Sequence, residues 1–231
     1  MKAALTLFVL VGLSLGAVPV RGDVHDLSDG VLILHGAPGI EWTNYCEMWP
    51  GYQGIDSCGE QVNRADFEPG QDYLFLILHV IAAWTEPKEF CQVEFGLGDF
   101  DALNYMMWGS FTEACFEGSG TVTPTAGWPG PNEGITLTAT DVPWSGELAH
   151  VYVMAVYAYG YPEPPPPCVI PLAPHPVSGF GGTVNCLDPP QAYPAVCFGG
   201  VGIGTDGLFC CPEGPSPAHE MSWGRVKDLY R

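Results

Sequence analysis

The sequence predicts an all-β fold: an immunoglobulin-like or jelly-roll-like β-sandwich with disulfide-stapled loops and a Cys/Gly-rich C-terminal extension. The 231 residues include 30 glycines and 23 prolines, 14% are charged and 47% are hydrophobic, which argues against helical bundles, coiled coils and charged disordered chains. Short β-branched or aromatic runs are separated by turn residues, and no helical stripe of three turns appears in the body. A closed barrel is the alternative.

Residues 1–22 have the pattern of a cleaved secretory signal peptide. Lys2 is followed by an apolar run over residues 3–18, and Val20 and Gly22 precede Asp23. The run is shorter than the roughly 20 apolar residues that a membrane span needs. We therefore expect an exported protein, secreted or held at the cell surface, with no membrane insertion after signal cleavage.

Five runs are expected to form strands: residues 30–35, 73–82, 92–95, 134–138 and 148–157. The run 73–82 is apolar on both faces, which predicts the middle strand of a sheet that is covered on both sides. Ile135, Leu137 and Ala139 alternate with threonines, which predicts a strand with one face in water. Residues 99–108 are expected to form a short helix or a loop.

The domain boundaries follow from changes in composition. Residues 23–160 are expected to form the sandwich. Residues 161–176 are a Pro-rich arm that is expected to lie outside any sheet interior, because proline lacks the N–H that a sheet requires. Residues 177–211 are a Cys/Gly-rich extension packed on the sandwich, and residues 212–231 are a linker and a basic-aromatic tail.

The tail is a candidate sorting signal. It contains three of the five basic residues that remain after signal cleavage, and a short helix would place several of its side chains on one face. Either the tail docks on the acidic body of its own chain, or an export or surface-attachment apparatus reads it. The candidate sorting residues are Trp223, Arg225, Lys227 and Tyr230.

Nine cysteines follow the leader. In an exported protein this number predicts disulfides, and the close CxxC pairs of zinc sites are absent. Pairs of neighbours are the simplest interpretation, each worth roughly 3 kcal/mol, although the connectivity stays open. These pairs are Cys46–Cys58, Cys91–Cys115 and Cys186–Cys197. One thiol among Cys168, Cys210 and Cys211 then stays free, links two chains or is capped.

The charge balance excludes polyanionic partners. The chain has 7 Lys and Arg residues against 26 Asp and Glu residues, and two of the basic residues, Lys2 and Arg21, lie in the leader. Nucleic acid and anionic membrane surfaces are therefore not expected to bind.

Two groups of residues are candidate metal ligands. His35, His79 and His150 each lie in a predicted strand, and they would bind a metal if the strands placed them on one face. Hydrogen-bonded imidazoles are the favoured alternative. Acidic loops offer oxygen ligands without the EF-hand spacing, so no metal and no cofactor are predicted, with a structural calcium as the alternative. The loop residues are Asp66, Glu68, Asp72, Asp99, Asp101, Asn132 and Glu133.

No catalytic residues are predicted. The chain has no Gly-x-Ser-x-Gly elbow, no HExxH and no P-loop lysine. A pair of carboxylates for glycoside hydrolysis depends on distances in space and cannot be read from the sequence.

A cluster of aromatic residues is the candidate ligand-binding site. Trp42, Tyr45, Trp49 and Tyr52 lie in a loop that a Cys46–Cys58 bond would close. Rigid rings on such a loop either present a face to a sugar or a partner protein, or cap one end of the sandwich. Trp108, Trp128 and Trp144 are further candidates by the same argument.

Three stretches of the chain resemble uncharacterised secreted proteins of uncultured bacteria: the leader, Thr-Ala-Gly-Trp-Pro-Gly-Pro-Asn-Glu-Gly at 125–134 and Ser-Trp-Gly-Arg-Val-Lys-Asp-Leu-Tyr-Arg at 222–231. The resemblance implies bacterial export and brings no known activity. We expect a non-catalytic extracellular or cell-surface structural or adhesive protein, with a protein or polysaccharide partner. A carbohydrate-binding module is the first alternative, and a hydrolase on a sandwich scaffold is the second.

Overall fold

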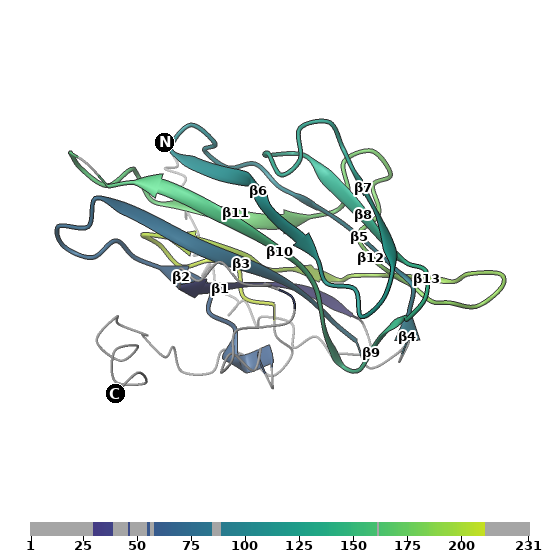
Figure 1. Ribbon diagram of the computed structural model, residues 1–231. Coiled ribbons are helices and arrows are strands. Elements are labelled where there is room, and N and C mark those ends of the chain that lie inside the picture. The colour runs from purple at the N-terminus through teal and green to yellow at the C-terminus, as the bar shows by residue number, and fades with distance from the viewer. Residues whose placement is uncertain are drawn as a thin grey trace, which may run out of the picture.

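The computed structural model shown in Figure 1 describes residues 30–38, 46, 55, 58–84, 89–160 and 162–210. Its first sheet has five strands in the order β14 (Cys197–Phe198), β1 (Val31–Pro38), β3 (Tyr73–Ala83), β10 (Leu148–Tyr159) and β6 (Tyr105–Ala114). Within the described residues, no helix is long and apolar enough to cross a membrane.

The second sheet has eight strands. Its main path runs through β13 (Ala192–Pro194), β12 (Gly182–Val184), β5 (Gln92–Leu97), β11 (Cys168–Ala173), β15 (Gly200–Ile203) and β2 (Arg64–Ala65). The remaining two strands, β8 (Gly134–Ala139) and β7 (Gly120–Pro124), extend it from β5. A separate ribbon pairs β4 (Glu89–Phe90) with β9 (Trp144–Ser145), and a 3₁₀ turn spans Cys58–Glu60.

The two sheets pack face to face, so the predicted β-sandwich is confirmed. One large cluster of buried side chains fills the space between them, with Leu76 and Leu78 from β3 meeting Phe95 and Leu137 from the second sheet. All five predicted runs lie in strands. β3 is the middle strand of its sheet and is buried on both faces, as its continuous apolar run predicts.

The alternating pattern of β8 has the predicted effect. Ile135 and Leu137 are fully buried, whereas Thr136 and Thr138 are half-buried on the opposite face. For residues 99–108 the prediction of a short helix or a loop is confirmed in part: residues 99–104 form a loop, whereas residues 105–108 begin β6. No helix forms there.

The expectation for the Pro-rich arm is wrong over residues 168–173, which form β11 inside the second sheet, between β5 and β15. Pro171 lies opposite Gly98, just beyond the end of β5, where no N–H is required of it, and its carbonyl accepts the Gly98 N–H at 2.9 Å. The Cys/Gly-rich residues 182–203 likewise supply strands β12 to β15 to the two sheets.

The predicted disulfide pairs are wrong, although Cys46, Cys91, Cys115, Cys186 and Cys197 are all bonded. The observed bonds are Cys46–Cys115, Cys91–Cys186 and Cys197–Cys210. Their Cα atoms lie 4.9 to 5.7 Å apart, since strands far apart in sequence become neighbours in a sheet. Cys168 is the free cysteine among the described residues. Cys211 and the side chain of Cys58 lie outside the described part of the chain.

Candidate functional site

The outer face of the five-stranded sheet carries three groups of side chains in succession. Along β3, the residues Leu74, Leu76 and Leu78 point into the core between the sheets. The alternate residues therefore point outward. From one end of the strand to the other, these are two aromatic residues, then Ile77, then His79 and Ile81.

At one end, the strands bring the three predicted histidines together. His35 on β1 lies directly opposite His79 on β3, and His79 Nδ1 is 2.7 Å from His150 Nε2 on β10. His35 and His79 are 4% and 3% exposed. Burial, and then the charge of neighbouring His150, lowers the pKa of His35 to about 4 and that of His79 well below its usual value. Burial lowers the pKa of His150 to about 4.

Hydrogen bonds engage one ring nitrogen of each of the three histidines. The Val62 N–H donates to His35 Nδ1 at 3.0 Å, and a neutral imidazole that accepts at Nδ1 carries its proton on Nε2. His79 and His150 share one proton between them. No three His, Cys, Asp or Glu residues are arranged to hold a metal ion in the part of the chain that the structure describes.

The acidic loop residues mostly fix their own turns. The Asp101 carboxylate accepts the Asn104 side-chain N–H and the N–H groups of Leu103 and Asn104, and the Asn104 side chain is the main cause of its lowered pKa. Asp66 is paired with Arg64 at 2.9 Å. Asp66 and Asp101 therefore already have partners close to them in sequence.

The middle of the outer face is apolar. Ile77, Val153 and Ala155 form a buried cluster with Cys115, and Cys46 packs against it. The Cys46–Cys115 bond thus fastens the chain at residue 46 onto this face.

At the other end lies a set of side chains that we call the aromatic strip: the exposed Tyr73 of β3, Tyr159 of β10, and Met106 and Trp108 of β6, together with the half-buried Tyr157 of β10. Tyr73 stacks on Tyr157 with 5.6 Å between ring centroids, and Tyr157 contacts the Tyr159 ring at 4.8 Å. Trp108 meets Tyr157 at 6.2 Å. Tyr159 is 63% exposed, Met106 52% and Tyr73 44%, so water reaches a contiguous set of large apolar side chains.

A shallow hollow lies just beyond this end of the strands. It encloses about 320 Å³ and is lined by the turn at residues 67–72 and by Gly160, Pro162 and Pro164. Glu68, Gln71 and Asp72 give it polar walls. Because Asp72 directly precedes Tyr73 and Gly160 directly follows Tyr159, the hollow adjoins the aromatic strip.

The structure describes only some of the predicted site residues. Trp42, Tyr45, Trp49 and Tyr52, and the tail residues Trp223, Arg225, Lys227 and Tyr230, lie outside the described residues. Trp108 belongs to the aromatic strip. The other two candidates serve the interior: the buried Trp144 donates to the Cys115 carbonyl at 2.6 Å, and Trp128 donates to the Tyr152 hydroxyl at 2.9 Å.

Sequence reasoning missed the three tyrosines of the strip. The signal was present in Tyr157-Ala-Tyr159, where two rings alternate at the end of an apolar strand just before a glycine. Their meeting with Tyr73 depends on the pairing of β10 with β3, in which Tyr159 lies opposite Tyr73.

A second cluster lies on the outer face of the other sheet. The buried Glu94 accepts a hydrogen bond from the Ser178 hydroxyl, and His175 Nδ1 is 3.6 Å from the same carboxylate oxygen. His175 Nδ1 also faces the N–H groups of Val177 and Ser178. The Ser178 hydroxyl therefore bonds to the carboxylate and not to the imidazole, whereas the Ser178 backbone N–H faces the imidazole. This arrangement fixes the 175–178 turn and differs from the serine–histidine pair of nucleophilic catalysis.

No protein-family model matches this chain, and no curated protein matches it. Among solved structures, the chain is similar to a cohesin module from a family 33 glycoside hydrolase of Clostridium perfringens. The two share 8% sequence identity with a TM-score of 0.39, over 75% of this chain and 96% of that module. A likeness at this level carries no information about function.

Proposed function

We propose that this chain is an exported, non-catalytic adhesive module that binds its partner through the aromatic strip. The strip carries the proposal, because contiguous exposed apolar side chains on a soluble protein mark interaction sites. Tyrosine, tryptophan and methionine are also the residue types that are enriched at protein interfaces. The three disulfides among the described residues support an oxidising, extracellular location.

A cell-retention assay tests the proposal. We expect the double variant Tyr73→Ser/Tyr159→Ser to lose about tenfold or more of its retention on the surface of the producing cells, since a few exposed aromatics dominate such interfaces. The melting temperature should stay nearly unchanged because both rings are exposed. The matched control Val177→Ser/Leu187→Ser removes exposed apolar groups outside the strip and should retain binding. Equal retention of all three proteins would contradict the proposal.

Polysaccharide binding is the second candidate function. It is supported by tyrosine rings with apolar faces and hydroxyl edges beside a hollow with polar walls. The predicted loop aromatics remain part of this candidate. Affinity electrophoresis in polysaccharide gels distinguishes the loop aromatics from the aromatic strip as the binding site. Loss of retardation in Trp42→Ala/Trp49→Ala, with an unchanged melting temperature, would assign binding to the loop and not to the strip.

The sorting role of the tail also remains a proposal, and the concentration of basic residues in it is its support. Deleting residues 221–231 should redistribute the protein between the cell surface and the medium. If the deletion strain still sends all of the protein to its usual location, the proposed sorting role is wrong.

A further inference from the structure

We infer that the aromatic strip binds a basic, extended polypeptide segment of a partner protein, with arginine or lysine side chains packed on the rings and held by carboxylates around the strip. This inference rests on the proposed function and specifies its partner. It joins two independent features of the molecule: the exposed rings and the distribution of charge.

The first step is the position of the acidic loops. β3 begins at Tyr73, β10 ends at Tyr159 opposite it, and β6 begins at Tyr105 opposite Ala158. The three loops that continue these strands, with the described residues 66–72, 98–104, 160 and 162–167, therefore gather at one end of the sandwich, drawn at the left of Figure 1. They carry the carboxylates of Asp66, Glu68, Asp72, Asp99, Asp101 and Glu163.

The second step is the lack of compensating positive charge. Arg64 is the only lysine or arginine among the described residues, and it lies 2.9 Å from both Asp66 and Asp206. Five of the six loop carboxylates thus have no described lysine or arginine beside them. This end of the molecule repels anions and attracts cations, which disfavours an acidic glycan or a membrane as the ligand.

The third step is the chemistry of the rings. A guanidinium or ammonium over the face of a tyrosine or tryptophan is attracted by the ring electrons, and nearby carboxylates add to this attraction. A neutral sugar would stack on the rings but would gain nothing from the charge. The strip spans three adjacent strands, which lie about 4.8 Å apart, and the adjoining hollow is shallow, so an extended segment fits better than a helix with deep anchors.

The experiment measures fluorescence anisotropy with the full mature chain and a defined probe. The probe is a labelled twelve-residue peptide with four arginines in a Gly/Ser background, and its citrulline analogue has the same shape without charge. We expect the arginine peptide to bind and the citrulline peptide to bind at least about tenfold more weakly. The triple variant Tyr73→Ser/Tyr157→Ser/Tyr159→Ser should also bind about tenfold more weakly, although its net charge is unchanged.

A charge-matched pair of variants separates local recognition from general attraction. Glu68→Gln/Asp72→Asn removes two carboxylates beside the strip, whereas Glu117→Gln/Asp188→Asn removes two from loops at the opposite end of the sandwich. We expect the first variant to bind more weakly with a smaller salt dependence, and the second to bind as the parent does. Equal weakening of both would overturn the inference, because it would show attraction by the whole polyanion.

Four other results would overturn the inference in distinguishable ways. Equal binding of both peptides would show that the cation is not recognised. Salt-independent binding of a neutral oligosaccharide at the strip, without peptide binding, would overturn the basic partner and leave the adhesive function intact. A gain in peptide affinity on deletion of residues 221–231 would identify the tail of the chain itself as the occupant. If the strip variants keep both peptide binding and cell retention, the result would contradict the proposed function as well as this inference.

Discussion

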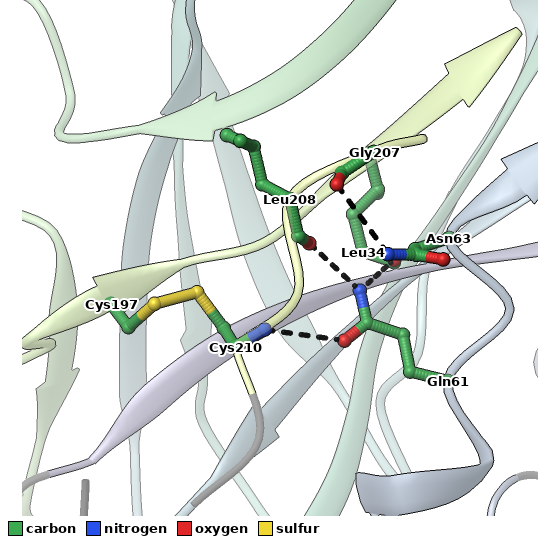
Figure 2. The surroundings of a disulfide bond; sticks show 7 residues. All are labelled: Leu34, Gln61, Asn63, Cys197, Gly207, Leu208 and Cys210. Carbon is green, nitrogen blue, oxygen red and sulfur yellow. Dashed lines mark hydrogen bonds between the residues drawn. A yellow bond between two sulfur atoms is a disulfide. The ribbon is translucent and has the colours of Figure 1, made fainter. Parts of the chain in front are cut away.

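At the scale of single residues, one buried amide connects segments that are far apart in the sequence. Gln61 Nε2 donates to the Leu34 carbonyl at 3.0 Å and to the Leu208 carbonyl at 3.2 Å, while its Oε1 accepts the Cys210 N–H at 3.5 Å (Figure 2). The side chain is 8% exposed. These bonds hold the end of the described chain, beside the Cys197–Cys210 disulfide, against β1.

Replacing Gln61 by methionine keeps the side-chain volume and removes all three hydrogen bonds. Because its bonds to the Leu34 carbonyl and the Cys210 N–H are buried, we expect Gln61→Met to lower the free energy of unfolding by about 2–4 kcal/mol. Urea denaturation followed by tryptophan fluorescence measures the change. Gln71→Met is the matched control, since Gln71 accepts one bond in an exposed turn, and it should cost less than about 1 kcal/mol. Equal stability of Gln61→Met and the parent would show that the amide is dispensable.

At the scale of elements, side-chain contacts and disulfides connect strands and loops that are far apart in the sequence. The histidine cluster joins β1, β3 and β10 on the outer face of the five-stranded sheet. Cys91–Cys186 joins the residue between β4 and β5 to the loop after β12, across 95 residues, whereas Cys197–Cys210 spans 13. The two kinds of link lead to separate predictions.

The histidine cluster predicts an acid-labile fold. His35 and His150 have pKa values of about 4 in the folded state, below the usual 6.5, so the unfolded chain takes up protons first as the pH falls. These two groups do not reduce the free energy of unfolding above pH 6.5. Their protonation in the unfolded chain should reduce it progressively between pH 6.5 and 4, and the reduction should level off below pH 4. At pH 4, each imidazole should have lowered the free energy of unfolding by about 3 kcal/mol relative to neutral pH.

Urea denaturation at a series of pH values checks this prediction. In His150→Gln the slope between pH 6.5 and 4 should be smaller, because one of the titrating groups is gone. An identical slope in the variant and the parent would mean that other groups cause the acid lability.

The length of the loop that each disulfide closes predicts how much stability is lost when that disulfide is removed. On the chain-entropy model, Cys91→Ala/Cys186→Ala should cost about 4–5 kcal/mol and Cys197→Ala/Cys210→Ala about 3 kcal/mol. Differential scanning calorimetry of the two double variants measures the order. Cys168→Ala, which removes the free thiol, is the control and should change stability by less than about 1 kcal/mol. A reversed order would show that local packing outweighs loop entropy.

At the scale of the whole molecule, charge opposes folding. The full chain has a net charge of −19, and the folded body brings its carboxylates closer together than the unfolded chain does. Arg64, the one lysine or arginine among the described residues, already bridges two aspartates. Stability is therefore expected to depend on ionic strength.

Salt should stabilise the protein. Raising NaCl from about 0.02 M to about 0.5 M shortens the Debye length from roughly 20 Å to roughly 4 Å, so the self-repulsion weakens and the melting temperature should rise by a few degrees. Differential scanning fluorimetry measures the rise. The variant Glu117→Gln/Glu147→Gln/Asp188→Asn, which removes three exposed charges, should show a smaller rise. A melting temperature that falls with salt in both proteins would refute this account.

The sequence by itself determined the fold class, the location of five strands and the side of β8 that faces water. A strand has a period of two, so the order of apolar and polar residues along it indicates which face is buried. The sequence did not reveal the strand identity of residues 168–173, since the tolerance of Pro171 depends on where β5 ends. Only the tertiary structure decided which cysteines pair, that three histidines share one face, and that Tyr73, Tyr157 and Tyr159 form a strip. Each of these depends on register between strands far apart in the chain, and packing of the whole core sets that register.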